Sequence, residues 1–406
     1  MTAHAHPLGG RATDRPRLEV ADIVRAHGEA FARAHVLLPE QHAVLRDIAR
    51  CRTAALGGYV DVCAACGHAE VGYHSCRNRN CPKCQSLEQA RWVERRMERM
   101  LPTHSFHVVF TLPSELRALA MRNREAVFDM LFAAASETLL ELGRDPKWLG
   151  AQLGVTSVLH TWTRDLRFHP HVHCIVTGGG LSLDGERWVS TRPEFLLPVR
   201  VLGALFRGKI LARLQKAYDR GELSLDGAVA SLAQRSVFNR LRDKLYRMRW
   251  IVYAKPPFGG VEHAVRYLGH YTHRVGISNH RLLSFDERGV TFRTRGDGRA
   301  TLSPDEFLRR LIQHVLPPGF VKIRHHGLFA ASNVSTKLVA ARRLLQGAAT
   351  TPTDMSRTPR DFRELLLALT GIDVRRCPRC DVGAMIRGPL DPAVLARAAL
   401  PPPDTS

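Results

Sequence analysis

The sequence contains no long uninterrupted run of apolar residues. Its first residues, MTAHAHPLGGRATDRPRLEV, lack the apolar segment of a secretory signal. The most apolar helical candidate, FDMLFAAASETLLELG, is too short to cross a bilayer and is interrupted by Asp129, Glu137 and Glu141. We therefore expect a cytoplasmic chain without a membrane partner, whose nine cysteines are metal ligands or reduced thiols rather than disulfides.

Acidic residues are scarce relative to basic ones. Lys and Arg together number 59 and Asp and Glu 38, which gives a net charge of +21. Such an excess fits a polyanionic partner, most often nucleic acid, and would place the protein on the nucleoid when it binds DNA. The alternatives are an anionic membrane surface, or a basic surface that has no partner. The shortage of acidic residues also argues against an acidic tail and against a membrane pump.

The rest of the composition is that of an ordinary globular protein, and 406 residues allow two or three domains. Strand-like and helical stretches alternate, and several strands are joined by short turns. One predicted hairpin pairs GVTSVLHTWT with HVHCIVTGGG, and a second turns at residues 286–289. This pattern predicts an α+β fold with an antiparallel sheet and flanking helices, rather than a doubly wound sheet. The triple glycine at 178–180 is expected to end its strand in a turn.

Composition also predicts four segments along the chain. Residues 1–50 are expected to be helical, and residues 51–101 to form a zinc-binding module that contacts DNA. Residues 102–346 hold most of the predicted strands and are expected to form the main domain. Residues 347–406 are a tail rich in Thr and Pro, with one isolated CPRC motif.

Four cysteines have the spacing of a zinc site. Two C-x2-C pairs are separated by fourteen residues, and each pair can chelate one metal ion from a tight turn. Four thiolates leave no open coordination position, so the predicted role of this zinc is in folding and DNA docking rather than catalysis. Cys76 lies between the two pairs and is a possible ligand, so the sequence does not decide which four residues bind the zinc. The predicted ligands are Cys63, Cys66, Cys81 and Cys84.

The other cysteines give weaker signals. Cys377 and Cys380 form half of a second zinc knuckle, but no further C-x2-C follows them. The sequence therefore does not decide whether a second zinc ion is bound. Cys51 and Cys174 are predicted to be buried like apolar residues rather than to bind metal.

Basic residues near the cysteines and on one predicted helix are candidates for phosphate contacts. The alternative is that these charges are simply solvated. Lys255, in YAKPPFGG, and Arg274 are candidates to clamp a DNA strand. The remaining candidates are Arg77, Arg79 and Lys83 beside the knuckle, and Arg240, Lys244 and Arg247 on the helix.

Alternating histidines in HPHVHCIV suggest a metal site on a strand. Side chains at i and i+2 of a strand point to one face, so His171 and His173 converge, whereas His169 is expected in the turn. If the turn is centred near residues 165–166, His160 lies opposite His171 and is a third ligand. A slip of one residue would reverse this. By ligand type alone, three imidazoles suit zinc, copper or another transition metal.

Two tyrosines in RYLGHYTHR are candidate nucleophiles. Tyr267 and Tyr271 are four residues apart, which places both phenols on one face of a helix. A phenol ionises near pH ~10, so a nucleophilic tyrosine needs a nearby cation or base. For a YxxxY motif seen alone, core packing would be the better explanation.

In chain order, FTLP, HVH and YxxxY resemble the motifs of the HUH nuclease superfamily. Within it, the chain closely resembles the rolling-circle transposases of the insertion-sequence 91 group over about residues 50–330. The resemblance is carried by SCRNRNCPKCQ, FHVVFTLP, VLHTW, HPHVHCIV, YAKPPFGG and RYLGHYTHRVGISNHRLL.

The resemblance implies an HUH nuclease core that cleaves single-stranded DNA at element ends and rejoins it. Mg²⁺ or Mn²⁺, rather than zinc, would be bound at the histidines. Tyr267 would attack the phosphate to form a 5′-phosphotyrosine link, and Tyr271 would carry a second link. The nearest alternative is a plasmid or phage rolling-circle replication initiator. A non-catalytic zinc-dependent DNA-binding protein is the alternative from another class.

Overall fold

The computed structural model describes residues 16–84, 99–255, 276–346, 363–364, 367 and 373–390. The chain falls into two compact units, and neither is continuous in sequence. The first unit contains residues 1–88, 277–315 and 355–406, and the second contains residues 89–276 and 316–354.

An antiparallel sheet organises the second unit, in the order β11-β4-β5-β3-β7, with β6 paired to β5. Every pair of neighbouring strands is antiparallel, which confirms the predicted α+β class. The strands are β3 (Ser105–Thr111), β4 (Ala151–Trp162), β5 (Phe168–Ser182), β6 (Trp188–Ser190), β7 (Val252–Lys255) and β11 (Ile323–Gly327).

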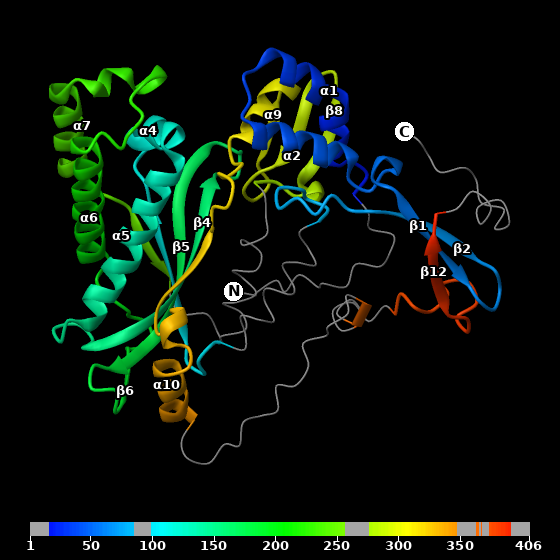
Figure 1. Ribbon diagram of the computed structural model, residues 1–406. Coiled ribbons are helices and arrows are strands. Elements are labelled where there is room, and N and C mark those ends of the chain that lie inside the picture. The colour runs from blue at the N-terminus through cyan, green and yellow to red at the C-terminus, as the bar shows by residue number, and fades with distance from the viewer. Residues whose placement is uncertain are drawn as a thin grey trace. The chain divides into compact units, whose positions relative to one another are not determined.

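Helices cover one face of this sheet, and Figure 1 shows α5 and α6 beside it. Alternate residues of β3, including Phe106 and Phe110, enter the large core beneath these helices, where the rings of Phe110 and Phe206 lie 4.9 Å apart. The other face carries a smaller core with α10 and, on the same strands, the histidines. The helices of this unit are α4 (Arg117–Arg122), α5 (Arg124–Arg144), α6 (Val199–Asp219), α7 (Arg235–Arg247) and α10 (Lys337–Gln346).

Helices α1 (Val20–Ala34), α2 (Pro39–Arg50) and α9 (Pro304–Ile312) belong to the first unit, with β8 (Leu282–Asp286), β9 (Gly289–Arg293) and β10 (Arg299–Leu302). Figure 1 shows these helices side by side. The backbone N–H of Val20 donates to Asn279 Oδ1 at 3.1 Å, and Gln41 Nε2 donates to the Ile312 carbonyl at 3.2 Å. The Asp286–Gly289 turn is confirmed.

The structure therefore corrects two predicted boundaries. Residues 277–315 belong with the N-terminal helices rather than to a continuous main domain of residues 102–346. The reason is that α1 and α9 each bury an apolar face, through residues such as Phe31 and Phe307, and the N-terminal helices alone would leave such faces in water. The tail also contributes a strand, β12 (Met385–Pro389), which pairs with β1 (Gly58–Cys63), itself paired with β2 (Ala69–Tyr73).

The triple glycine lies inside β5, so the prediction of a strand-ending turn is wrong. A Cβ at Gly178 would lie 2.3 Å from the His104 ring, and one at Gly180 would lie 2.6 Å from the Gln152 carbonyl oxygen. Here β4, β6 and the His104 side chain approach β5 so closely that no side chain fits. His169 likewise lies in β5 rather than in the turn.

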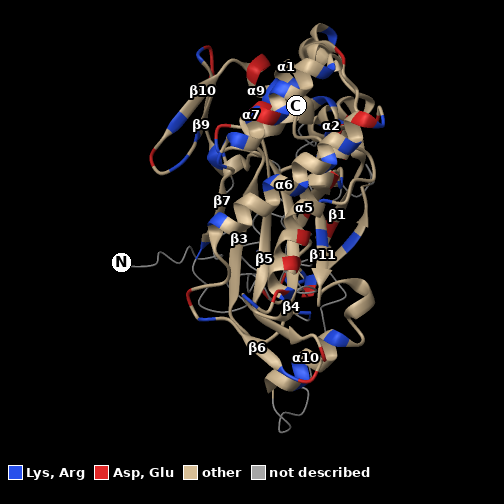
Figure 2. Ribbon diagram, turned by 90° about the vertical axis from the view of Figure 1, so that its left-hand side faces the viewer, with Lys and Arg blue, Asp and Glu red and all other residues tan. Residues whose placement is uncertain are grey.

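Within the described ranges, no helix is long and apolar enough to span a membrane. Lys and Arg lie on β9, β10 and α10 as well as on the helices beside the large sheet (Figure 2).

Replacing Gly180 by Ala is expected to lower the free energy of unfolding by roughly 1–3 kcal/mol, because the added methyl group overlaps the backbone of β4. Chemical denaturation followed by tryptophan fluorescence measures this. Gly208→Ala is the matched control, since a Cβ there meets nothing within 4 Å and α6 gains up to ~1 kcal/mol of helix propensity. Equal stability of the two variants would contradict the close approach of the strands.

Candidate functional site

Three histidines converge on the face of the sheet that the large core leaves uncovered. The β4–β5 hairpin turns at residues 163–167, where Leu166 has a φ of 64°. Its register places His160 directly opposite His171, as predicted from the sequence. His173 follows two residues later on the same face, and one nitrogen of each of the three rings lies within 4.8 Å of the others. This grouping has the size of a site for a single ion.

Hydrogen bonds orient two of these rings. The Nδ1 of His171 lies 2.6 Å from the His169 carbonyl oxygen, which can only accept, so Nδ1 carries the proton and Nε2 keeps its lone pair. The His173 Nδ1 is hydrogen-bonded to His107 Nε2 at 2.7 Å, and these two rings are parallel to within 5°. His160 stacks on Trp162 with a centroid separation of 4.7 Å. Fixed tautomers and ring orientations are typical of histidines that bind metal.

Burial keeps the imidazoles of His171 and His173 neutral. It lowers the pKa of His171 to about 4, and it lowers the pKa of His173 well below its usual range, with smaller contributions from the charges of neighbouring histidines. Because only the neutral imidazole offers a lone pair, these residues remain ligands at pH values where an exposed histidine would be protonated.

His107 is a site residue that the sequence analysis missed. It lies on β3 within FHVVFTLP, is fully buried, and burial lowers its pKa to about 4. In the β3–β5 register, Val109 lies opposite His173, so His107, two residues before Val109, shares the histidine face. The sequence does contain a signal for His107, because apolar residues alternate with it along β3. Phe106, Val108 and Phe110 enter the large core, which places His107 on the opposite face.

Lys255 lies at the edge of the same face. On β7 it is directly opposite His107, and its positive charge contributes to the low pKa of both His107 and His173. A cation at this position suits the phosphate contact predicted for it. The other residues predicted for this part of the site, Tyr267, Tyr271 and Arg274, lie outside the described residues.

The cysteines form two groups of four rather than the single group predicted. The C-x2-C pairs at 63–66 and 81–84 do not share a site, because each lies beside other cysteines instead. The first group contains Cys51, Cys76, Cys81 and Cys84, and the second contains Cys63, Cys66, Cys377 and Cys380. Cys51 is buried, as predicted, but it lies in the first group, which contradicts the prediction that it is no metal ligand. Cys174 is buried in β5 and belongs to neither group.

The first group joins a helix end to a knuckle. Cys51 caps the C-terminus of α2, and Cys84 Sγ lies 3.5 Å from the Sγ of Cys51 and 3.6 Å from that of Cys76. Disulfide sulfurs are about 2.05 Å apart, whereas four thiolates around zinc at about 2.3 Å lie roughly 3.8 Å apart. The observed separations match the second arrangement.

The second group has the same spacing. The Cys63–Cys380 and Cys66–Cys377 sulfur separations are both 3.7 Å. Backbone N–H groups, chiefly that of Val382, lower the pKa of Cys380 to about 6. Both groups offer four sulfur ligands, the donor set that zinc prefers in structural sites.

The basic residues predicted to contact DNA differ in their surroundings. Lys83 forms an ion pair with Glu19 and is only 17% exposed, so its charge is already compensated within the protein. Lys244 pairs with Glu115 at 3.3 Å but is largely exposed. Arg77 and Arg79 near the knuckle, and Arg240 and Arg247 on α7, are exposed.

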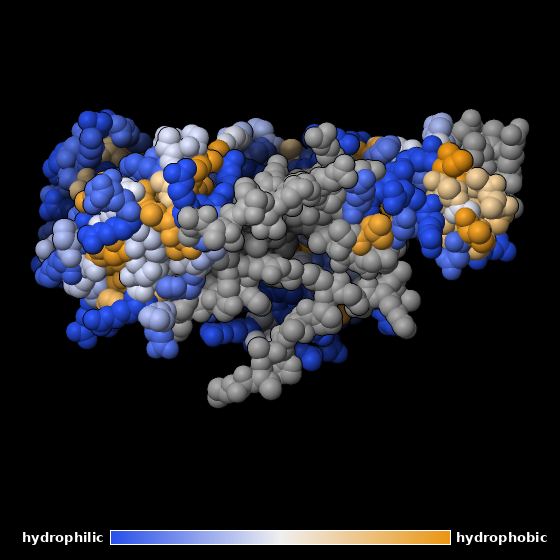
Figure 3. All heavy atoms as spheres, turned by 90° about the horizontal axis from the view of Figure 1, so that it is seen from below, coloured by the Kyte–Doolittle hydropathy of each residue, from blue (hydrophilic) through white to orange (hydrophobic). Residues whose placement is uncertain are grey.

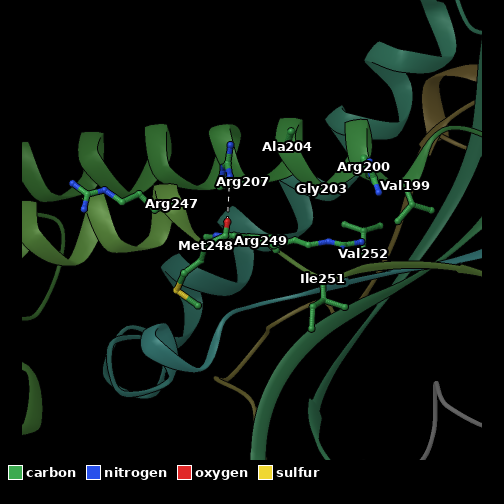
Figure 4. Close-up of a pocket in the computed structure, with 11 residues that line it drawn as sticks. Val199, Arg200, Gly203, Ala204, Arg207, Arg247, Met248, Arg249, Ile251 and Val252 are labelled. Carbon is green, nitrogen blue, oxygen red and sulfur yellow. Dashed lines mark hydrogen bonds between the residues drawn. The ribbon is translucent and has the colours of Figure 1, made fainter.

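A pocket of about 720 Å³ lies between α6, the end of α7 and the start of β7. Several arginines line the pocket, and three of them are exposed: Arg200, Arg247 and Arg249. Figure 4 shows Arg207 pointing from α6 to the backbone of Met248, whose carbonyl accepts its hydrogen bond at 3.1 Å. The pocket thus combines one guanidinium fixed by a hydrogen bond with three exposed ones, a combination suited to phosphate.

Comparisons with known proteins show which proteins this chain resembles. A family described as "Putative transposase" matches residues 154–337, and the "Transposase zinc-binding domain" matches residues 23–112. A protein named "Putative transposase y4qJ", from Sinorhizobium fredii, is 45% identical over 91% of this chain and 94% of its own length. The "Transposase for insertion sequence element IS801" of Pseudomonas savastanoi pv. phaseolicola is 27% identical over 81% of this chain and 79% of its own length.

No solved structure matches this chain. The zinc-binding match includes the whole first group of cysteines, and the transposase match includes His160, His171 and His173. With 45% identity over nearly the whole length of this putative transposase, the chain belongs to the insertion-sequence 91 family of zinc-binding transposases.

Proposed function

We propose that this transposase cleaves and rejoins single-stranded DNA at the ends of its element, through a 5′-phosphotyrosine link, in rolling-circle transposition. The observation that supports this best is the convergence of His160, His171 and His173 on one sheet face in a chain of this family. A structural role would not require three imidazoles to share one small space. The replication-initiator alternative is disfavoured because both relatives described above are transposases.

In the proposed reaction, the phenolic oxygen of Tyr267 attacks the scissile phosphorus. The phenol gives up its proton as the new bond forms, the bond from phosphorus to the 3′-oxygen breaks, that oxygen takes up a proton, and the 5′-phosphate remains on the tyrosine. Rejoining reverses these steps, since a 3′-hydroxyl attacks the phosphotyrosine and releases the phenol. Tyr271 allows a second strand to be held while the first link persists.

The histidines fit a divalent metal ion. His171 presents Nε2, and His173 presents Nε2 when its Nδ1 donates to His107. Mg²⁺ or Mn²⁺ bound there would polarise the scissile phosphate and stabilise the negative charge that develops on it. Imidazole donors favour Mn²⁺ over Mg²⁺, which prefers oxygen ligands.

Cationic side chains would hold the DNA strand. Lys255 extends the histidine face at the sheet edge, where it can contact a phosphate beside the cleavage point. The arginine-lined pocket beside α6 offers further phosphate contacts on the same unit. The zinc-binding domain would then help to dock element-end DNA, and the protein would act on the nucleoid in the cytoplasm.

An oligonucleotide labelled at its 3′ end and carrying the element's end is expected to transfer its label to the protein in the presence of Mn²⁺. The same oligonucleotide labelled at its 5′ end should not, because only the downstream fragment stays attached. A denaturing gel detects the adduct. Label transferred from the 5′ end would contradict the proposed polarity.

Tyr267→Phe combined with Tyr271→Phe, and His171→Ala combined with His173→Ala, should each abolish this adduct. Tyr218→Phe and His42→Ala are the controls, since Tyr218 lies at the end of α6 away from the pocket and His42 is exposed on α2. An adduct that persists in either double variant would overturn the assignment.

His107→Ala is expected to raise the Mn²⁺ concentration for half-maximal cleavage by roughly 10- to 100-fold, because His173 loses the partner that orients it. A titration of cleavage against Mn²⁺ measures this. His107→Gln, which keeps a polar atom near the Nε2 position, should recover part of the loss. If His107 only supports folding, the yield of folded protein would fall while the Mn²⁺ midpoint stayed unchanged.

Arg247→Gln combined with Arg249→Gln should weaken binding to single-stranded DNA and reduce its dependence on salt. With about 0.7 counterions released per single-strand phosphate contact, the slope of log K against log salt should fall by about 1.4. Lys216→Gln with Arg220→Gln, at the opposite end of α6 from the pocket, should leave the slope unchanged. An unchanged slope in the pocket variant would exclude the pocket as a DNA contact.

A further inference from the structure

The C-terminal CPRC motif is not an isolated half-knuckle. Its two cysteines lie with Cys63 and Cys66, at the other end of the chain, and the Cys66 and Cys377 sulfurs meet across a separation of 311 residues. The two C-x2-C turns are built alike. Gly67 N donates to the Cys63 carbonyl, Asp381 N donates to the Cys377 carbonyl, and both Gly67 and Asp381 have positive φ, of 70° and 57°.

Backbone N–H groups surround the sulfurs of this second group. Cys66 N lies 3.5 Å from Cys63 Sγ, Arg379 N lies 3.4 Å from Cys377 Sγ, and Gly383 N lies 3.4 Å from Cys380 Sγ. Gly383 itself lies against Cys63, since a Cβ added to it would be 2.3 Å from the Cys63 Sγ. Peptide donors aimed at sulfur stabilise the thiolate, which is the form that binds metal.

In the described part of the chain, the C-terminal segment is otherwise held by its backbone pairing with β1 and by few buried side chains. Strand β12 has five residues, and only Met385 among them is buried. The small core here consists of Met385 and cysteines of the second group, and Val382 and Ile386 are 89% and 61% exposed. Figure 3 shows apolar surface over this part of the first unit. A core of this size cannot offset the entropy lost when a strand is ordered at the end of a very long loop.

One polar contact gives the segment its register. Arg387 of β12 donates two hydrogen bonds to Asp61 of β1, at 2.8 and 2.7 Å, and its guanidinium lies 3.5 Å from the centroid of the Tyr59 ring. This contact is specific but largely at the surface, so it selects the partner strand more than it stabilises the pairing.

We propose that the chain binds two zinc ions, and that the second, held by Cys63, Cys66, Cys377 and Cys380, fastens residues 373–390 to the N-terminal module as the third strand of its sheet. The sheet β12-β1-β2 is thus assembled from segments about 300 residues apart in the chain. The pairing of β12 with β1 depends on the metal ion. The site is separate from the histidine site and does not depend on DNA cleavage by the tyrosines.

Metal analysis of the purified full-length protein tests the number of sites. Two zinc ions per chain are expected in the wild type, and one in each of two double variants, Cys377→Ser with Cys380→Ser and Cys81→Ser with Cys84→Ser. Cys174→Ala is the matched control and should keep two, because Cys174 lies in the large core. One zinc ion per chain in the wild type would overturn the proposal.

A cleavable version of the whole chain tests the fastening without altering a ligand. A specific protease site is placed between residues 350 and 356, and the protein is cut after purification. The C-terminal fragment should co-elute with the rest in zinc and be released by a chelator. Release while two zinc ions remain bound, or retention after both are removed, would overturn the proposal.

Gly383→Ala provides a third measurement on uncut protein. Because its methyl group would displace the Cys63 sulfur, the second zinc should pass to a competing chelator at least ten times faster than in the wild type. The first zinc should be lost at the wild-type rate. Equal acceleration at both sites, or no acceleration at the second, would exclude the proposed geometry.

Discussion

The pairing of β4 with β5 is the constraint on which the second unit depends. These are the two longest strands, and every other strand of the sheet is attached to one of them directly or through β3. Since side chains alternate along a strand, a shift of one residue would turn His160 into the apolar core and Leu159 out of it. Val172 and Cys174 on β5 enforce the same choice, because they alternate with His171 and His173. The packing that stabilises the sheet also sets the position of the histidines.

The turn between the two strands takes part in this constraint. Leu166 adopts a left-handed conformation, which is costly for a residue with a branched side chain, yet it is fully buried. Thr163 closes the turn, since its hydroxyl accepts from the Arg167 N–H at 3.0 Å. Burial of Leu166 thus offsets the backbone strain, and the turn holds the register from its own end.

Local periodicity was enough to predict much of this arrangement. The class of fold, the β4–β5 hairpin and the position of His160 opposite His171 follow from alternation and turn spacing, which act over a few residues. Contacts between strands that are distant in the sequence were harder to predict. His107 was missed because nothing near it in the sequence shows that β3 lies beside β5, and the glycines at 178–180 were misplaced because their neighbours come from β4, β6 and His104.

The cysteines show the same limit more clearly. A C-x2-C pair identifies two ligands of one ion, but the spacing of two such pairs does not show that they share it. Cys81 and Cys84 lie with Cys51 and Cys76, which have no pairing motif of their own, and the 63–66 pair lies with cysteines more than 300 residues away. The boundary of the first unit was unpredictable for a related reason, since α9 reaches α1 and α2 only through tertiary packing.

The joining of the two chain ends also has a consequence for synthesis on the ribosome. Strand β1 and its cysteines emerge from the ribosome long before β12. At about 5–20 residues per second, the 311 residues between Cys66 and Cys377 take about 15–60 s to translate. During that interval β1 is paired with β2 on one edge and unpaired on the other. The thiols of Cys63 and Cys66 lack the other two cysteines of their group. A chain that terminates before β12 keeps that edge and those thiols exposed, so the sheet β12-β1-β2 is complete only when translation has passed Pro389.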